Sequence, residues 1–281
     1  MIKFENVVVA GWEPALRGMR NPKNSWDKSD TLYNSAIPVI GENDYDLAMR
    51  LVKGGPVHAK FRRMIVVYFD VVAPLYWWKE FDTYKIGTVS NSCSTMHKIT
   101  AKEFTIEDFS HEHLMIDGIP AEIIAGGNKH LTTAYGELQN IVRVLNHYRK
   151  LYLETDNPKI KKQYWWQLIQ LLPTSYNQRR TIMANYEVLF DAYHSRKGHK
   201  LDEWSEEFIK MCENLPYSEF FTTKPSKDVY NLNDILDWLQ KEVPNMSHND
   251  FMKILETTRK SRGEVWDGAG VWSEYREKDK E

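Results

Sequence analysis

The run MIVVYFDVVAPLYWW, residues 64–78, constrains the fold most, because β-branched and aromatic side chains crowd it and its one charged residue is Asp70. This density indicates a strand over residues 63–72 that is buried on at least one face. Pro74 then favours the first turn of a helix that runs to about Asp82. Broken by Asp70 and Pro74, the run falls short of the roughly 18 apolar residues of a membrane helix. The chain must therefore fold around a buried strand followed by an aromatic helix.

The segment KEFDTYKIGTVSNSCSTMHKI, residues 79–99, turns polar directly after this apolar run. Thr, Ser and Asn side chains hydrogen-bond to nearby backbone groups and compete with regular structure, so we predict a loop. Loops held by a rigid scaffold often present binding and catalytic groups. An ordinary surface connection explains the same composition, and both interpretations stay open at this point.

The composition is typical of a soluble globular protein of 281 residues, with 42% hydrophobic and 27% charged residues. A net charge of −2 argues against a sequence-wide basic field that would bind nucleic acid. Cys93 and Cys212 are the two cysteines, too few for a disulfide framework or a four-thiolate zinc site, which favours a reducing cytoplasm. No stretch suggests export or membrane insertion. The 10 Trp and 15 Tyr residues indicate either an aromatic core and subunit interface or a surface that stacks on a ring ligand.

Periodicity predicts the other elements. Residues 2–10 read as a strand, and GMRNPKNSWDKSD, residues 18–30, as a polar loop. TSYNQRRTIMAN, residues 174–185, is predicted to be a connection that carries two adjacent arginines. Apolar residues at three- and four-residue spacing predict helices. The predicted helices are NDYDLAMRLVKGG (43–55), IEDFSHEHLM (106–115), residues 130–155, residues 158–172, YEVLFDAYHSR (186–196) and LDEWSEEFIKMC (201–212).

Two regions are predicted along the chain. Residues 1–223 contain the elements above. Residues 224–281 form a C-terminal helical extension, with helices in LNDILDWLQKEV and HNDFMKILETTRKSR and a charged tail.

Several motifs of known chemistry are absent: the Gly-rich phosphate loops, HExxH and Gly-x-Ser-x-Gly. His111 and His113 form the one close histidine pair, but on a helix they would lie on different faces, so no metal site is predicted. Cys93 lies four residues before His97, yet nothing else suggests a nucleophilic triad. A thiol without a catalytic role is the favoured interpretation.

The order of elements carries more information. The sequence HAKF, a hydrophobic strand, Ala73-Pro74, an aromatic helix, a polar loop and then Leu-Leu-Pro resembles the flavin-dependent thymidylate synthase family. The signature of that family, RHRxxSxNExSxRY, follows a strand and a helix that begins with Ala-Pro. The family also has an Asn twelve residues after Leu-Pro and an Arg eleven residues after that Asn; Pro173, Asn185 and Arg196 keep both spacings. Trp204 follows one residue later than the family's Trp.

The signature itself is much altered. When the chains are aligned on Ala73-Pro74, the family's Arg-His-Arg falls on Thr83-Tyr84-Lys85 and its Asn-Glu falls on Ser90-Asn91. Its Ser falls on Cys93, and its Arg-Tyr falls on Thr95-Met96. Several arginines that would hold phosphate are therefore missing. Lys85 is a point charge and does not reproduce the planar, bidentate contact of an arginine.

The resemblance implies an α/β (α+β) fold, the thymidylate synthase-complementing protein fold, in which long helices flank a central sheet. It also implies a homotetramer with sites between subunits. The cofactor FAD would be bound by His58, Tyr84, Lys85, Asn185 and His199, with Tyr84, Trp77 or Trp78 available to stack on the flavin. A pyrimidine nucleotide would be bound by Asn91, Cys93, Ser94, Arg179, Arg180 and Arg196.

The chemistry implied is one-carbon transfer to C5 of a deoxyuridylate-like nucleotide, from methylene-tetrahydrofolate through reduced FAD, with NADPH as reductant and no enzyme nucleophile. Because the signature is altered, a second hypothesis is that the fold is kept and this chemistry lost, which leaves a nucleotide-binding protein. A phage-type interaction protein that uses its aromatic surface and binds no flavin is the third. The nucleotide and the group transferred, methyl or hydroxymethyl, stay open.

Overall fold

The computed structural model describes residues 2–117, 120–125, 128–225, 247, 249–250, 253, 264–266 and 272–274. The chain divides into two compact units, Met1–Lys224 and Pro225–Glu281, which are described separately. None of the described helices combines the length and the apolarity needed to cross a bilayer.

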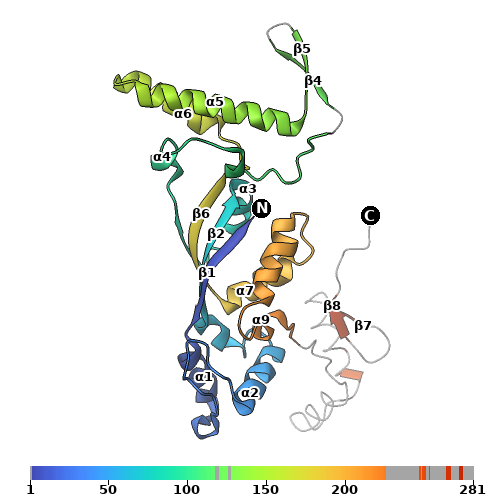
Figure 1. Ribbon diagram of the computed structural model, residues 1–281. Coiled ribbons are helices and arrows are strands. Elements are labelled where there is room, and N and C mark those ends of the chain that lie inside the picture. Colours follow the sequence, from blue (N-terminus) through green and yellow to red (C-terminus); the bar gives the residue numbers. More distant parts are fainter. Residues whose placement is uncertain are drawn as a thin grey trace. The chain divides into compact units, whose positions relative to one another are not determined.

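A four-stranded antiparallel sheet organises the first unit, with strand order β1-β2-β6-β3 (Figure 1). The strands are β1 (Lys3–Ala10), β2 (Val66–Pro74), β6 (Asn177–Asn185) and β3 (Val89–Ser92). The strands predicted at residues 2–10 and 63–72 are confirmed, as is the mixed α/β (α+β) class.

Strand β6 corrects the prediction that residues 174–185 are a connection. It pairs with β2 on one side and with β3 on the other, so it lies in the middle of the sheet. Ile182 and Ala184 of this strand are buried, whereas Arg179 and Thr181 are exposed. A strand with one polar face, paired on both sides with distant residues, carries little apolar signal of its own.

Strand β3 corrects the prediction that residues 79–99 form one loop. Its four residues pair with Met183 to Arg180 of β6, and the short helix α4 (Thr95–Lys98) follows. The irregular parts are residues 82–88, the Cys93-Ser94 connection between β3 and α4, and Ile99.

One face of the sheet is covered by helices. These are α3 (Leu75–Phe81), α7 (Tyr186–Arg196), the π-helix η5 (Glu203–Phe208), α8 (Ile209–Glu213) and α9 (Glu219–Thr222). Trp77, Trp78 and Trp204 are buried in this core, and the rings of Trp77 and Trp204 stack with centroids 4.4 Å apart. Aromatic rings bury a large apolar area, so much of the aromatic content serves packing. Because Trp77 and Trp78 are buried, the hypothesis that either stacks on a flavin is wrong.

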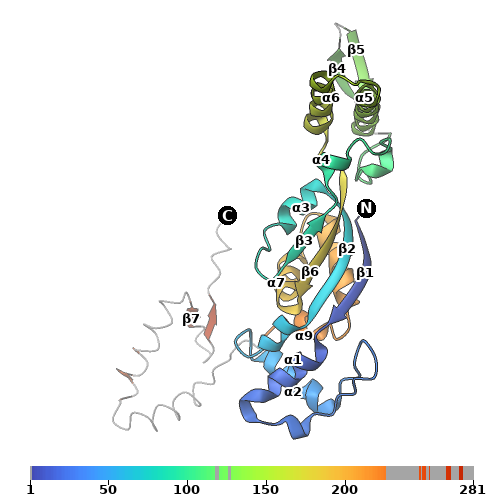
Figure 2. The same cartoon turned by 90° about the vertical axis from the view of Figure 1, so that its left-hand side faces the viewer.

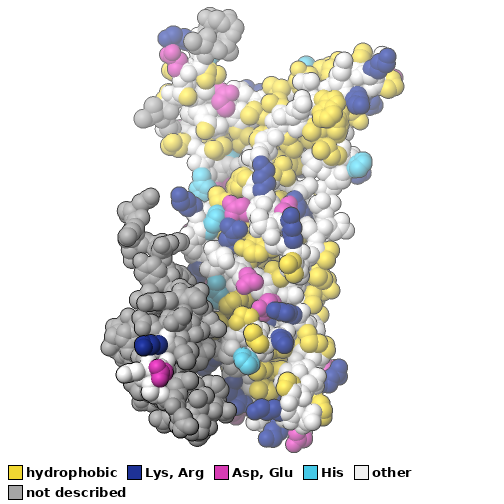
Figure 3. Space-filling model, turned by 180° about the vertical axis from the view of Figure 1, so that it is seen from behind, with side chains coloured by type: hydrophobic (Ala, Val, Ile, Leu, Met, Phe, Trp, Pro, Cys, Tyr) yellow, Lys and Arg dark blue, Asp and Glu magenta, His cyan; other side chains and the backbone are white. Residues whose placement is uncertain are grey.

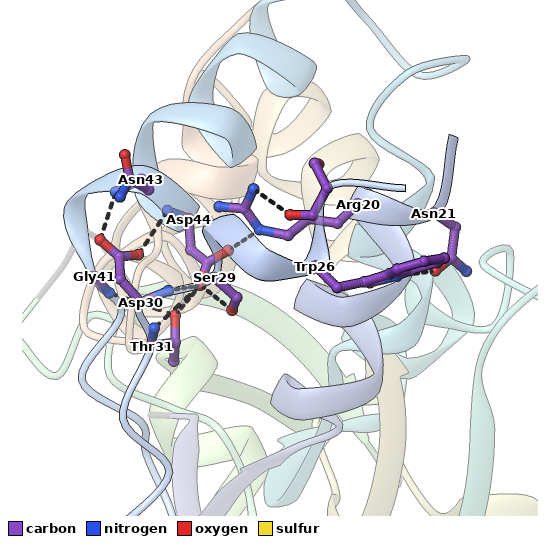
Figure 4. A network of polar contacts seen from close by, with 10 residues as sticks. Arg20, Asn21, Trp26, Ser29, Asp30, Thr31, Gly41, Asn43 and Asp44 are labelled. Atoms are coloured by element: carbon purple, nitrogen blue, oxygen red, sulfur yellow. Dashed lines mark hydrogen bonds and ion pairs between the residues drawn. The ribbon is translucent and has the colours of Figure 1, made fainter. Parts of the chain in front are cut away.

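The helices near one end of the sheet are α1 (Trp12–Arg20), η1 (Asn21–Lys23), η2 (Trp26–Lys28), α2 (Glu42–Lys53) and η3 (Lys60–Met64). The helix predicted at residues 43–55 is confirmed as α2, whereas α1 extends into the predicted polar loop. Buried Asp44 holds the segment between them, accepting hydrogen bonds from Arg20, Ser29, the Asp30 backbone and Thr31 (Figure 4).

The two longest helices, α5 (Ala134–Glu154) and α6 (Pro158–Leu171), are confirmed at their predicted positions, but they pack on each other beyond the end of the sheet (Figure 1). A second hydrophobic cluster, including Phe109, Leu145 and Leu168, joins them to the preceding segment. The hairpin of β4 (Ala121–Ala125) and β5 (Asn128–Thr132) precedes α5. The helix predicted at residues 106–115 is wrong, since only the turn η4 (Ile106–Asp108) is helical.

In the second unit, β7 (Glu264–Trp266) pairs antiparallel with β8 (Trp272–Glu274). The helices predicted within residues 224–281 fall almost entirely outside the described residues. Asn249, Asp250 and Lys253 are the described members of the second of them, and all three are helical.

Candidate functional site

The two faces of the sheet differ in whether helices cover them. Within the described residues of the first unit, no helix lies over the face opposite α7 (Figure 2). Tyr68 of β2 and Val89 of β3 are 44% and 58% exposed on this open face. Side chains alternate along a strand, so adjacent Arg179 and Arg180 of β6 point to opposite faces. The two arginines predicted to bind one nucleotide therefore do not converge within a single chain.

Asp70 is the centre of a polar cluster on the open face. It accepts hydrogen bonds from Asn6 Nδ2 at 2.9 Å, Thr181 Oγ1 at 2.6 Å and Arg179 Nη2 at 3.0 Å. These three donors lower the pKa of Asp70 to about 2. Arg179 also pairs with Glu5 at 2.7 Å, so its guanidinium is shared between two carboxylates.

Asn91 lies on the same open face, where it pairs with Thr181 across β3 and β6. Its side chain is exposed and makes no hydrogen bond to a described residue.

On the helix-covered side, Arg196 is the centre of a second cluster. Its Nη1 lies 2.5 Å from Glu80 Oε2, and its Nε donates to Tyr84 Oη at 3.0 Å. The guanidinium also lies over the Trp204 ring, 4.7 Å from the centroid. Only 16% of the Arg196 side chain is exposed, because these groups enclose it.

His199 joins this cluster through the same carboxylate. Its Nε2 lies 3.1 Å from Glu80 Oε2, and its Nδ1 accepts from the Leu201 N–H at 3.1 Å. Because Nδ1 acts as acceptor, Nε2 carries the proton and donates to Glu80. Glu80 therefore receives hydrogen bonds from both Arg196 and His199.

The π-helix η5 places Trp204 beneath Arg196. Glu203, at the start of this helix, is buried and accepts a hydrogen bond from the Tyr76 hydroxyl of α3. Burial, together with the Glu203 carboxylate, raises the pKa of Tyr76 to about 12. Local π-helical geometry is often found at functional sites.

Arg180, on the same side of the sheet as Arg196, is also held by contacts within the chain. Its Nη1 lies 2.7 Å from Asp82 Oδ1, its Nε donates to Gln178 Oε1 at 2.9 Å, and its guanidinium lies 4.2 Å from the centroid of Trp78. Its side chain is 14% exposed.

Cys93 and Ser94 connect β3 to α4. Cys93 is exposed, and its backbone N–H donates to Arg179 O at 2.9 Å. Ser94 caps α4 by accepting from the His97 N–H, and its Oγ lies 2.7 Å from His97 Nδ1. Hence His97 pairs with Ser94, and no described residue makes a contact that would activate the Cys93 thiol.

Asn185 ends β6 and caps α7, since its Oδ1 accepts from the N–H groups of Glu187 and Val188 at 3.1 and 3.0 Å. Gly87, with φ of +79°, packs against it: an added Cβ would lie 3.2 Å from Asn185 Nδ2. Lys85, two residues earlier, is exposed and forms no ion pair with a described residue. His58 is exposed in the turn before η3, beside Gly54.

Among the predicted site residues, the structure places Tyr84, Arg196 and His199 in one cluster and Asn185 at the start of α7. Arg179 and Asn91 lie on the other face. Sequence reasoning missed the carboxylates Glu80 and Asp70, although Glu80 lies one helical turn before Tyr84. Among the described residues, no three His, Cys, Asp or Glu side chains are grouped as a metal ion would require.

The fold is similar to that of flavin-dependent thymidylate synthases. A structure of ThyX from Helicobacter pylori with FAD and dUMP aligns with a TM-score of 0.50 and 14% identity, covering 77% of this chain and 96% of that chain. A second structure of that enzyme with FAD and dUMP aligns with a TM-score of 0.51 and 14% identity, over 77% and 98% of the two chains. PolB from Streptomyces cacaoi, a UMP/dUMP methylase bound with 5-Br dUMP, aligns with a TM-score of 0.44 and 14% identity. The alignment covers 80% of this chain and 96% of that chain.

No model of a protein family and no curated protein sequence matches this chain. The structural alignments show that the chain has the ThyX fold, as the order of its sequence elements predicted.

Proposed function

We propose that this protein binds a pyrimidine deoxynucleotide and transfers a one-carbon unit to its C5 position with reduced FAD, methylene-tetrahydrofolate and NADPH. The observation that carries the proposal is the fold, which spans nearly the whole length of an enzyme whose structure contains FAD and dUMP. The convergence of Tyr84, Arg196 and His199, all three identified by the family resemblance, supports it.

FAD would be held by His58, Tyr84, Lys85, Asn185 and His199. Lys85 is an exposed cation without an ion pair in the described part of the chain, and the Nδ2 of Asn185 is left to donate while its Oδ1 caps α7. These groups fit a diphosphate and a polar ring edge. Once bound and reduced by NADPH, FAD would supply electrons and carry the one-carbon unit to the nucleotide.

The nucleotide would be held by Asn91, Cys93, Ser94, Arg179, Arg180 and Arg196. Because these residues lie on both faces of the sheet, a site that uses all of them needs a second chain. We therefore propose a homotetramer with sites between subunits.

Exposed apolar side chains on α5 and α6 support the proposed assembly. Val144, Leu153, Ile160, Trp166 and Leu171 are 38–52% exposed on these helices, and hydrophobic side chains gather over them (Figure 3). Exposed apolar side chains gathered in this way are typical of an interface.

One observation favours a second candidate, a nucleotide-binding or phage-type interaction protein that has kept the fold and lost the chemistry. Arg179, Arg180 and Arg196 each pair with a carboxylate of the same chain. A nucleotide phosphate would have to displace those carboxylates, which weakens its binding.

The test adds FAD at about 0.1 mM, with and without dUMP, and records flavin fluorescence and melting temperature, because a ligand that binds only the native state raises the melting temperature. Quenched fluorescence and a raised melting temperature are expected, followed by release of tritium from C5-labelled dUMP when the other substrates are present. The mass of the product distinguishes methyl from hydroxymethyl transfer. If neither ligand produces a response, the enzyme proposal fails and the second candidate remains.

A further inference from the structure

The hairpin of α5 and α6 carries an excess of positive charge. Residues 138–172 contain six Lys and Arg side chains but only two carboxylates, Glu154 and Asp156, so the net charge of this segment is +4. The whole chain has a net charge of −2, so the excess is local. A concentration of cations on one element is typical of a surface that binds a polyanion. The hairpin lies beyond the end of the sheet and away from α7, which ends in Arg196 (Figure 1).

Four lysines gather where α5 ends and α6 begins. The two helices pack on each other and are joined by three residues, so Lys150 of α5 lies close to the first turns of α6. The Lys161 ammonium of α6 lies 5.0 Å from the centroid of the Tyr152 ring of α5, which places these helix ends together. Lys150, Lys159 and Lys162 are exposed, and with Lys161 they form what we call the tip patch.

A row of cations leads from the tip patch along α5. Arg143, His147 and Lys150 recur at four- and three-residue spacing, which places them on the side of the helix opposite buried Leu145. All three are exposed. Asn140, one turn earlier, extends the row and accepts a hydrogen bond from Arg143 Nη1 at 2.8 Å. Because Lys150 belongs to both, the row and the tip patch are continuous.

Helix stability does not explain the tip patch. The first turn of α6 contains no carboxylate. Lysines near the positive end of a helix dipole lower helix stability, whereas carboxylates there would raise it. Among the described residues, Lys159, Lys161 and Lys162 have no ion-pair partner, and Lys150 lies 3.8 Å from Glu154. Solubility would be served by charges of either sign. These cations are therefore available to a partner outside the chain.

We propose that the tip patch and the row on α5 bind the phosphate backbone of a nucleic acid. Cations neutralise phosphates, and exposed amide side chains hydrogen-bond to base edges. Asn140 and Gln163 supply exposed amides among the cations, since Gln163 lies one turn after Lys159. The headgroups of an anionic membrane would meet the same cations but present no base edges to these amides. Single-stranded RNA, single-stranded DNA and duplex DNA share the backbone chemistry, and the test distinguishes them.

Fluorescence anisotropy of labelled single-stranded RNA, single-stranded DNA and duplex DNA, each about 20 nucleotides long, measures binding to the full-length protein. At least one of them is expected to bind, with an affinity that falls as salt rises. In Lys159→Gln/Lys162→Gln the affinity should fall about ten-fold, and the slope of log affinity against log salt should decrease by about 0.7–0.9 per cation removed. Arg143→Gln tests the row independently and should also weaken binding. Lys23→Gln/Lys28→Gln removes the same charge from two exposed lysines near α1 and should leave binding unchanged.

Four results would overturn the proposal. The first two are that none of the three nucleic acids binds, and that both double variants weaken binding equally. The third is displacement of the nucleic acid by dUMP, which would place it in the proposed nucleotide site. The fourth comes from vesicles of phosphatidylserine and phosphatidylcholine: if they bind more tightly than any nucleic acid and lose this binding in Lys159→Gln/Lys162→Gln, the tip patch is a membrane surface. The binding assay contains no FAD and needs no catalysis, so its outcome is independent of the proposed function.

Discussion

Nε of Arg20 lies 2.6 Å from Oδ1 of Asp44, and both side chains are buried. The other carboxylate oxygen, Oδ2, receives the Ser29 and Thr31 hydroxyls and two backbone N–H groups (Figure 4). This one carboxylate therefore connects α1, α2 and the segment between them. A buried ion pair is costly to break, because removing one partner leaves the other charge uncompensated.

Asp44→Ala should lower the free energy of unfolding by about 3–5 kcal/mol, since it leaves Arg20 buried without its partner. Asp46→Ala, on the exposed side of the same helix, is the matched control and should change stability by less than about 0.5 kcal/mol. Urea denaturation followed by circular dichroism measures both values. Equal stability of the two variants would contradict the role assigned to Asp44.

The pH dependence of stability should also report Asp44. Burial raises the pKa of this carboxyl, but hydrogen bonds from Thr31, Ser29 and Arg20 outweigh burial and leave the pKa below its ordinary value. A lowered folded-state pKa means that the contribution is complete above the unfolded pKa and is lost as pH falls through the folded one. The acid limb of the stability curve should be shallower in Asp44→Asn, as measured by denaturation between about pH 2 and 6.

Asp70 should titrate near pH 2 in the folded protein, because Thr181, Asn6 and Arg179 all donate to its carboxylate. Thr181→Val should raise this pKa, since it removes the first of those donors and preserves the shape of the side chain. The carboxyl ¹³C shift followed by NMR measures the midpoint in each protein. A midpoint at the ordinary aspartate value in the unchanged chain would refute the cluster on the open face.

Gly11→Ala should be strongly destabilising. Gly11 has φ of +89°, and an added Cβ would lie 2.1 Å from the backbone oxygen of Met64. Backbone strain alone costs about 1–3 kcal/mol, and the clash adds to it. Gly198→Ala is the control, because nothing lies within 4 Å of its added Cβ. Thermal unfolding should separate the two variants by several degrees.

Arg196→Ala should weaken the binding of dUMP about ten- to a hundred-fold, because the charged hydrogen bond it removes is worth about 1.5–3 kcal/mol. Arg17→Ala, at a surface arginine paired with Glu13, should leave this affinity unchanged. Titration calorimetry measures the affinity of each variant. Unchanged binding in Arg196→Ala would remove this residue from the site.

Light scattering at micromolar concentration should find a tetramer, and Trp166→Glu should dissociate it while the helical circular dichroism is retained. Trp166 is 42% exposed on α6, so a charged side chain there should hardly change the stability of the monomer. In an apolar interface the same charge would be buried without a partner and would weaken the association of subunits. Lys162→Glu, an exposed substitution on the same helix, is the control for charge. A monomeric unchanged protein would count against sites shared between subunits.

The sequence by itself determined the elements whose signal is local. Apolar periodicity located α5, α6 and α7, and β-branched density located β2, because the side chains that decide these elements are near neighbours along the chain. Local spacing also identified Pro173, Asn185 and Arg196, which together with the order of elements indicated the fold.

Only the tertiary structure decided which residues meet. Strand β6 takes its place from partners on β2 and β3, about a hundred residues away, so its own polar sequence does not reveal it. The alternation of that strand sends Arg179 and Arg180 to opposite faces. Glu80 and Arg196 lie 116 positions apart in the sequence, and in the fold they form an ion pair. Such pairings depend on where α3 and α7 lie in the folded chain, which no local pattern specifies.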